Sequence, residues 1–208
     1  MALIDISRSI SPATAVWPGD QEVEWTWTTR LGRDDASVNL GAIELSTHVG
    51  SHVDAPFHVD EEGGTVDDLP LSAFVGPADV VEVGSASSIC PDHLEGSTAD
   101  RVLFKTEASH LSDDGWPDSI AFFEPATVRH LGREGAVLIG TDAPSVDPLD
   151  SETLPAHHAL REAGIANLEG LCFEDVPPGS YYLMAFPLKI SGADASPVRA
   201  VLRESIPD

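Results

Sequence analysis

The sequence predicts an α+β fold in which a substantial mixed sheet carries few helices. Short apolar runs of strand-like composition recur along the chain, whereas only residues 124–134 and 153–164 show the apolar spacing of helices. No internal repeat, low-complexity segment or linker divides the sequence, so residues 1–208 are expected to form a single domain. A chain of this length can bury a hydrophobic core.

The first half of the chain is predicted to consist mainly of strands and turns. Residues 22–29 alternate most clearly, which places Val23, Trp25 and Trp27 on one face of a strand. Trp17 lies in a turn, where it either packs over the core or forms a flat wall for an aromatic ligand. Strands are expected at 3–6, 22–29, 38–45, 79–83 and 101–106, helical turns at 70–76 and 91–94, and loops at 59–68 and 107–118.

The second half of the chain is predicted to alternate helices with strands. An apolar run at 136–139 suits a buried strand and leads into a loop at 140–145, a common position for site residues. Ser151 or Thr153 is expected to cap the following helix, which ends near Gly164. Further strands are expected at 165–168, 181–190 and 198–202.

The most informative segment spans residues 48–58, which hold three imidazoles and one carboxylate. His48, His52, Asp54 and His58 are separated by even offsets, so an extended chain presents all four on one side, whereas a helix would scatter them. Glycine, proline and β-branched valine in this segment also disfavour a helix. It is therefore predicted to be a strand, or a strand end entering a turn, whose polar groups are directed at one point.

Imidazole and carboxylate groups in this pattern indicate a metal site for zinc, or for manganese or iron. One segment rarely supplies every ligand, so another part of the chain is expected to complete the site. The helix at 153–164 carries His157 and His158, and Glu169 follows on the next strand. Either histidine can serve, and a second histidine with a bridging carboxylate would be enough for two metals about 3.5–4 Å apart.

The composition disfavours several classes of partner. The 35 acidic and 11 basic residues give a formal net charge of −24, which opposes binding to nucleic acid or to an anionic membrane surface. The near absence of lysine favours adaptation to high salt over an ordinary acidic protein, because salt screens the self-repulsion. No signal peptide or membrane span is apparent, so a cytoplasmic protein is expected. Cys90 and Cys172 lack CxxC spacing and are expected to be buried small residues.

The sequence HVGSHVDAPFH at residues 48–58 resembles the HxGTHxDxPxH motif of the cyclase-like metal-dependent hydrolases. Segments at 140–147, 167–171 and 187–189 extend the resemblance to the bacterial kynurenine formamidase (arylformamidase) branch of that family. The resemblance covers essentially the whole chain. Ser51 stands where the family usually has threonine, and it retains the hydroxyl.

The resemblance implies a swivelling β/β/α fold, usually a homodimer, with two zinc ions per subunit and manganese as the alternative metal. The metal ligands that it implies are His48, His52, Asp54, His157 and Glu169. Asp54 would reach both metals and Glu169 would bridge them. The family pattern His-x-x-Leu favours His157 over His158 as the ligand from the helix.

The resemblance also implies hydrolysis of N-formyl-L-kynurenine, a small-molecule substrate, to L-kynurenine and formate in tryptophan degradation. His58 would be the catalytic acid/base that protonates the leaving aryl amine, and Trp17 would contact the aryl ring. One alternative is another hydrolase of the same family that acts on a cyclic amide or lactone such as isatin. A second alternative is a non-catalytic protein with structural zinc, in which His58 would have no use.

Overall fold

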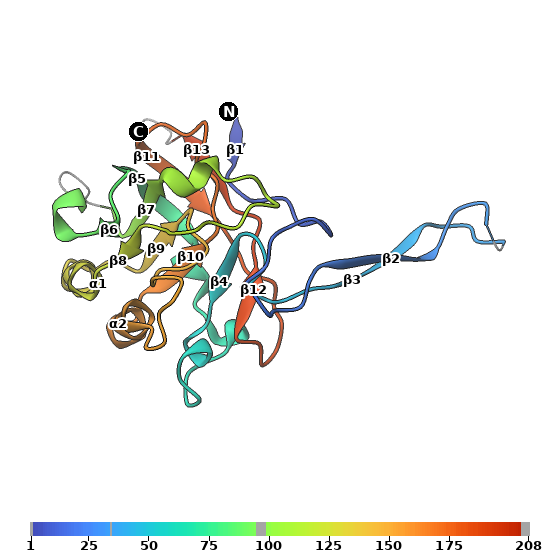
Figure 1. Ribbon diagram of the computed structural model, residues 1–208, viewed down its shortest axis with the longest axis horizontal. Coiled ribbons are helices and arrows are strands. Elements are labelled where there is room, and N and C mark those ends of the chain that lie inside the picture. Colours follow the sequence, from blue (N-terminus) through green and yellow to red (C-terminus); the bar gives the residue numbers. More distant parts are fainter. Residues whose placement is uncertain (1, 34, 95–98, 205–208) are drawn as a thin grey trace.

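The computed structural model describes residues 2–33, 35–94 and 99–204, and a nine-stranded mixed sheet forms its centre (Figure 1). In spatial order the strands are β1 (Leu3–Asp5), β13 (Val201–Glu204), β11 (Gly179–Met184), β5 (Val75–Gly84), β7 (Arg101–Thr106), β9 (Leu138–Thr141), β10 (Ala166–Glu169), β4 (His52–Asp54) and β12 (Ala195–Pro197). The four strands from β5 to β10 are parallel, and the flanking pairings are antiparallel. The predicted α+β fold with a mixed sheet is confirmed.

The parallel part of the sheet is buried on both faces. Helices α1 (Pro125–Arg133) and α2 (Pro155–Ala163) pack against one face, where Phe104 of β7 and Ile139 of β9 join their apolar residues in one cluster. The adjacent Leu103 and Leu138 point the other way, into a second cluster. Because successive residues of a strand face opposite sides, burial on both faces explains the continuous apolar runs in the sequence.

The remaining regular elements are short. A small parallel pair consists of β6 (Ser88–Ile89) and β8 (Phe122–Phe123), which the sequence did not predict. Short 3₁₀ helices occupy Pro56–His58, Val66–Asp68, Leu71–Phe74, Pro91–Leu94 and Glu107–His110. Among the described residues, no helix has the length and apolar character that crossing a membrane requires.

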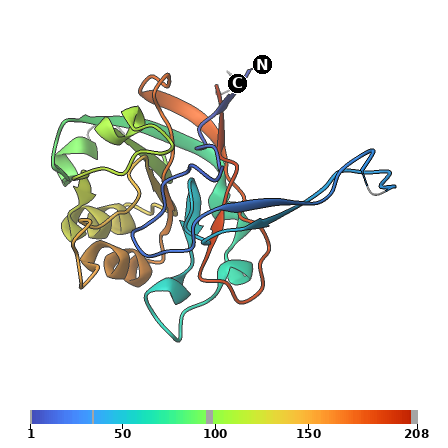
Figure 2. The same cartoon turned by 45° about the vertical axis from the view of Figure 1, so that its right-hand side comes forward.

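Strands β2 (Glu24–Thr29) and β3 (Leu40–Glu44) pair with each other and form a separate antiparallel ribbon. Figures 1 and 2 show this ribbon projecting from the body of the molecule. The sequence predicts strands at 22–29 and 38–45, but it gives no indication that these strands lie outside the main sheet.

Most strands differ by a few residues from their predicted extents, and two of the differences have identifiable reasons. The segment 48–58 is extended only over β4, because Gly50 has a positive φ of 63° and a 3₁₀ helix begins at Pro56. The strand expected at 181–190 ends at Met184. The chain then returns as β12, whose three residues lack a strand-like pattern and are held in place by pairing with β4.

Candidate metal centre and active site

The antiparallel pairing of β4 with β10 brings the histidine-rich segment against the second half of the chain. In this register Glu169 lies opposite His52, and Asn167 lies opposite Asp54. Alternate residues of a strand share a face, so the four side chains meet on one side of the sheet. The Asn167 amide donates to Asp54 Oδ2 at 2.8 Å and to Glu169 Oε1 at 3.2 Å, which fixes both carboxylates.

A hydroxyl and a glycine tie this segment to its neighbours. The Ser51 hydroxyl donates to the Gly170 carbonyl at 2.6 Å and accepts from the Arg8 amide at 2.9 Å. Gly170 has a φ of 64°, and a Cβ there would lie 2.3 Å from the Gly50 carbonyl oxygen. The chain therefore needs glycine at this position to bring the end of β10 against the turn before β4.

Asp54 and Glu169 each place one oxygen near His52 and the other near His157. His52 Nε2 lies 3.5 Å from Asp54 Oδ1 and 3.4 Å from Glu169 Oε2. His157 Nε2 lies 3.4 Å from Asp54 Oδ2 and 3.4 Å from Glu169 Oε1. Two carboxylates that span two imidazoles in this way can bridge a pair of metal ions.

His157 reaches this cluster because Asp147 holds the first turn of α2. The buried Asp147 carboxylate accepts hydrogen bonds from the backbone amides of Ala156 (2.8 Å) and His157 (3.0 Å). It also lies 2.7 Å from His157 Nδ1, which leaves Nε2 free to face the cluster. His158 is exposed, so of the two candidate histidines the structure brings His157 to the site.

His48 lies in the turn before β4 and contacts two carboxylates. Its Nδ1 atom is 2.9 Å from Asp54 Oδ1, and its Nε2 atom is 3.0 Å from Asp194 Oδ2. Asp194 also accepts from the Thr47 hydroxyl at 3.0 Å. A carboxylate on the far nitrogen of a ligating histidine fixes the orientation of the ring. Sequence reasoning missed Asp194, because nothing in its local sequence distinguishes it from other acidic residues.

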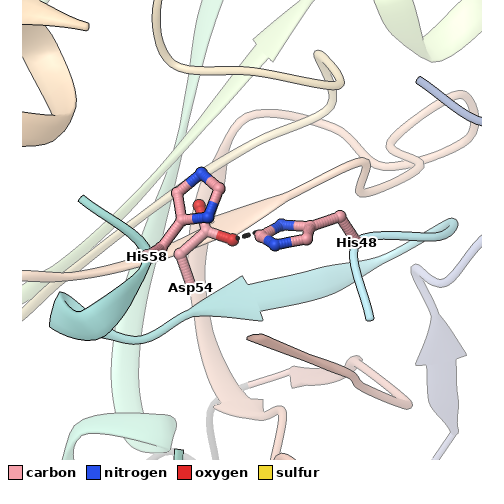
Figure 3. A group of neighbouring side chains, drawn as sticks. All are labelled: His48, Asp54 and His58. Atoms are coloured by element: carbon pink, nitrogen blue, oxygen red, sulfur yellow. Dashed lines mark ion pairs between the residues drawn. The ribbon is translucent and has the colours of Figure 1, made fainter. Parts of the chain in front are cut away.

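His58 lies beside the cluster, at the end of a 3₁₀ helix, and Figure 3 shows its ring close to Asp54 and His48. Its ring centroid is 4.3 Å from that of His48 and 5.6 Å from that of His157. Nδ1 of His58 lies 3.8 Å from Asp194 Oδ2. Burial lowers the pKa of the His58 imidazole below its usual value, which favours the neutral form.

The donor set of the cluster fits a divalent cation. Ligand atoms of His52, Asp54 and Glu169 lie within 4.8 Å of one another, and so do ligand atoms of His48, Asp54 and His58. A buried carboxylate is costly unless a cation neutralises it. Burial opposes charge on His48, but the carboxylates of Asp54 and Asp194 outweigh it and raise its pKa to about 9. The cluster therefore stabilises positive charge at its centre, and imidazole and carboxylate groups suit zinc or manganese.

A cavity of about 460 Å³ opens onto these residues. Trp17 and Trp116 line it and meet edge to face, with ring centroids 5.3 Å apart. Trp116 lies in the Asp- and Ser-rich segment expected to be a loop, where the sequence offered no signal for a site residue. The volume lies within the range of small-molecule pockets, and the two indoles provide aromatic walls.

Asp142, from the loop after β9, stabilises one wall of the cavity. It accepts hydrogen bonds from the backbone amides and hydroxyls of Thr106 and Ser109, at 2.6–3.0 Å. Burial raises the pKa of this carboxyl despite these bonds. The predicted loop therefore contributes a structural carboxylate at Asp142, whereas Asp147 contacts the histidine cluster.

Comparisons with known proteins agree with this geometry. The Cyclase family model, described as "Putative cyclase", matches residues 4–148. The chain is 62% identical over 209 residues to the kynurenine formamidase of Salinibacter ruber (strain DSM 13855 / M31), with 99% of each protein covered. It is 44% identical to the kynurenine formamidase of Geobacillus thermodenitrificans (strain NG80-2), with 97% of each covered.

A solved structure supports the same assignment. The chain matches a protein described as a potential metal-dependent hydrolase with cyclase activity at a TM-score of 0.84 and 30% identity, with 99% of both chains covered. These comparisons agree with the cluster of histidines and carboxylates, which offers the donor groups of a metal site. The agreement holds for the family model, for the two full-length relatives and for the solved structure. The chain therefore belongs to the Cyclase family and is a cyclase-like metal-dependent hydrolase.

Proposed function

We propose that this chain is an arylformamidase that hydrolyses N-formyl-L-kynurenine to L-kynurenine and formate in tryptophan degradation. The observation that carries the proposal is the 62% identity over the full chain to a relative named kynurenine formamidase. The site supports the same chemistry, because a candidate metal cluster opens into a cavity with aromatic walls. A bound metal would activate water for amide hydrolysis, and the aromatic walls suit an aryl group.

The proposed metal ligands are His48, His52, Asp54, His157 and Glu169. In this assignment Asp54 and Glu169 would serve both of two zinc ions, and manganese is the alternative metal. Support comes from the two carboxylates, which span His52 and His157 at 3.4–3.5 Å. Zinc, when bound, would lower the pKa of a water molecule from 15.7 to about 7 and so make hydroxide available at neutral pH.

His58 is assigned to proton transfer. As water adds to the formyl carbon and the amide C–N bond breaks, the nitrogen must gain a proton to leave as an aniline. The His58 imidazole lines the cavity beside the cluster and is more exposed than the imidazoles of His48, His52 and His157. It can accept a proton during the attack and return it to the departing nitrogen.

Substrate binding is assigned to the aromatic part of the cavity. The substrate carries a benzene ring next to the formamide, and the Trp17 indole is proposed to contact this ring. Trp116 holds Trp17 by an edge-to-face contact, so it is proposed to set the angle of that wall. Both residues line the same cavity as His58 and Glu169.

Three broader assignments complete the proposal. Residues 1–208 are proposed to act as one catalytic domain, which is supported by relatives that cover 97–99% of the chain. The chain is proposed to act in the cytoplasm and to assemble as a homodimer. The last two assignments follow the sequence and the family resemblance.

A spectrophotometric assay with N-formyl-L-kynurenine tests the proposed function. We expect turnover of this substrate that is abolished by a chelator and greatly exceeds turnover of isatin under the same conditions. The isatin comparison is the control for a different hydrolase of the same family. Faster hydrolysis of isatin, or no hydrolysis of formylkynurenine by the zinc-loaded protein, would reject the proposal.

A further inference from the structure

The cavity beside the metal cluster is poor in positive charge. Carboxylate side chains outside the proposed metal ligands line it at Asp20, Asp113, Asp142 and Asp194. Among the lining residues that the structure describes, Arg8 is the one arginine or lysine, in a chain of formal charge −24. The substrate of the proposed reaction is an α-amino acid, so its carboxylate enters a site that repels it. Recognition of that end of the substrate therefore needs the guanidinium of Arg8.

Arg8 is held in place at the wall of this cavity. Its Nη1 and Nη2 atoms donate to the carbonyls of Leu111 and Ala108, both at 2.8 Å, and its side chain is only 10% exposed. Its backbone amide donates to the Ser51 hydroxyl at 2.9 Å. Each terminal nitrogen of a guanidinium has a second N–H group, so both nitrogens retain a donor after these bonds form. The Arg8 head group is therefore pre-positioned and can still bind a planar anion such as a carboxylate.

The carboxylate of Asp113 lies next to the Arg8 guanidinium. Asp113 Oδ1 is 3.7 Å from Arg8 Nη1, a loose ion pair, and the Asp113 side chain is 42% exposed. Asp113 Oδ2 accepts from the Ser9 amide at 3.3 Å, which fixes the carboxylate without neutralising it. One cationic and one anionic group thus lie side by side on the cavity wall. This pattern is complementary to an α-amino acid, which carries its ammonium and its carboxylate on the same carbon.

The Arg8–Asp113 pair is also joined to the aromatic wall of the cavity. The Ala15 amide, two residues before Trp17, donates to the Asp113 carbonyl at 2.8 Å, and Trp116 follows Asp113 by three residues. In formylkynurenine the ring carries the formamide on one carbon and the amino-acid chain on the next carbon. A ring that contacts Trp17, with its formamide at the metal cluster, therefore leaves its amino-acid chain within the same cavity.

We propose that Arg8 and Asp113 bind the amino-acid end of the substrate, with Arg8 on the α-carboxylate and Asp113 on the α-ammonium. The inference rests on the proposed hydrolysis of formylkynurenine and deepens it, because it names the residues that select an α-amino acid over a plain aryl formamide. On binding, two ion pairs with the zwitterion replace the loose Arg8–Asp113 pair, so no charge of the substrate is left unpaired.

Two substrates that differ only in the amino-acid end test the proposal. N-formyl-L-kynurenine carries the zwitterion, whereas ortho-formamidoacetophenone has the same ring, formamide and adjacent ketone without it. We expect kcat/KM of the unmodified protein to be about 100-fold higher for formylkynurenine, as two charge-assisted hydrogen bonds would give. The ratio of the two kcat/KM values is the readout, because a general loss of structure lowers both values and leaves their ratio unchanged.

Asp113→Asn and, separately, Arg8→Met should each lower this ratio to about 10 or below, through KM for formylkynurenine rather than kcat. Asparagine keeps the shape of the Asp113 side chain and an acceptor for the Ser9 amide. Asp114→Asn removes the same charge from an exposed neighbour that does not line the cavity, so it is the matched control and should keep the full ratio. Calorimetry should show L-kynurenine binding weakened by about tenfold in the first two variants but not in the control.

Equal kcat/KM values for the two substrates in the unmodified protein would overturn the proposal, and so would an unchanged ratio in Asp113→Asn. An unchanged ratio in Arg8→Met, with both values lowered, would restrict Arg8 to holding the loop at Ala108 and Leu111 and overturn its role on the carboxylate. All of these results leave formylkynurenine hydrolysis intact. Hydrolysis of neither formamide by the zinc-loaded protein would instead reject the proposed function together with this inference.

Discussion

At the scale of single residues, His52 and His58 have different surroundings despite lying in one motif. His52 is buried and has two carboxylate oxygens within 3.5 Å of its Nε2 atom. His58 is partly exposed, and its ion pair with Asp194 is longer, at 3.8 Å. The surroundings of His52 suit a metal ligand, and those of His58 suit a group that exchanges protons.

We predict that His58→Ala lowers kcat by about 10²–10⁴, the usual contribution of a positioned proton donor, with little change in zinc content. His52→Ala is the matched comparison and should lose metal together with activity. Steady-state kinetics and metal analysis of both purified variants check this. A metal-depleted His58→Ala protein would make His58 a ligand, and a fully active one would assign proton transfer to another group.

The bridging geometry of Asp54 and Glu169 predicts the metal stoichiometry. Treatment with a chelator should abolish activity, and added zinc should restore it with two metals per chain, because each carboxylate offers one oxygen to each position. Titration of the metal-free protein with zinc, followed by activity, measures this number. Full activity at one metal per chain would remove the bridging roles, and full activity without metal would reject metal dependence.

At the scale of elements, helix α2 illustrates how one side chain can set both a helix terminus and a site. Asp147 binds the backbone amides of the first turn and the imidazole of His157. The residue at the helix start, Leu154, has a left-handed φ of 43° and no capping side chain of its own. Neither of the two predicted caps, Ser151 or Thr153, is the N-cap residue of α2; the Ser151 hydroxyl accepts a hydrogen bond from the Leu154 amide at 3.2 Å, in the turn before the helix.

Asp147→Ala should therefore have two separable effects. We expect a loss of about 1–3 kcal/mol in the unfolding free energy of the metal-free protein, from the unpaired buried amides. We also expect zinc affinity to fall by about 10–100-fold, because the His157 ring loses its orientation. Asp150→Ala, an exposed carboxylate in the same loop, is the control.

Denaturant unfolding and zinc competition with a chromophoric chelator measure the two effects of Asp147→Ala. Unchanged zinc affinity in a destabilised Asp147→Ala protein would restrict Asp147 to capping the helix. If Asp150→Ala weakens zinc binding as much as Asp147→Ala does, the loss of affinity comes from the change in net charge. Asp147 would then not position His157 for zinc binding.

At the scale of the whole molecule, the formal charge of −24 is the dominant feature. Repulsion among acidic groups destabilises the compact state, and the screening length falls from about 10 Å at 0.1 M salt to about 3 Å at 1 M. We predict that the melting temperature rises between 0.1 M and 1 M potassium chloride and then levels off. Thermal unfolding across this range checks the prediction, with an equal osmolarity of sucrose as the control.

A melting temperature that is indifferent to salt would reject adaptation to high salt and leave the catalytic assignment unaffected. An equal rise in sucrose would attribute the stabilisation to exclusion of the cosolute from the protein surface rather than to screening.

Much of the local structure followed from the sequence, because period, composition and turn chemistry act between neighbouring residues. The two helices and most of the strands lie where the apolar patterns indicated. The chemistry of the centre was also visible, since His52 and Asp54 are two residues apart and had to share a face once the chain was extended. The exact ends of the strands could not be predicted, as the short strand β4 shows.

The tertiary structure decided what meets that motif. Pairing of β10 with β4 sets Glu169 opposite His52, and the Asp147 cap turns His157 inward and leaves His158 exposed. Asp194 reaches His48 across 146 residues of chain. Such contacts depend on long-range strand register and on buried hydrogen bonds, which no local pattern encodes. The same reason explains why the alternation of residues 22–29 identified an apolar face of that strand but gave no information about where the β2–β3 ribbon projects.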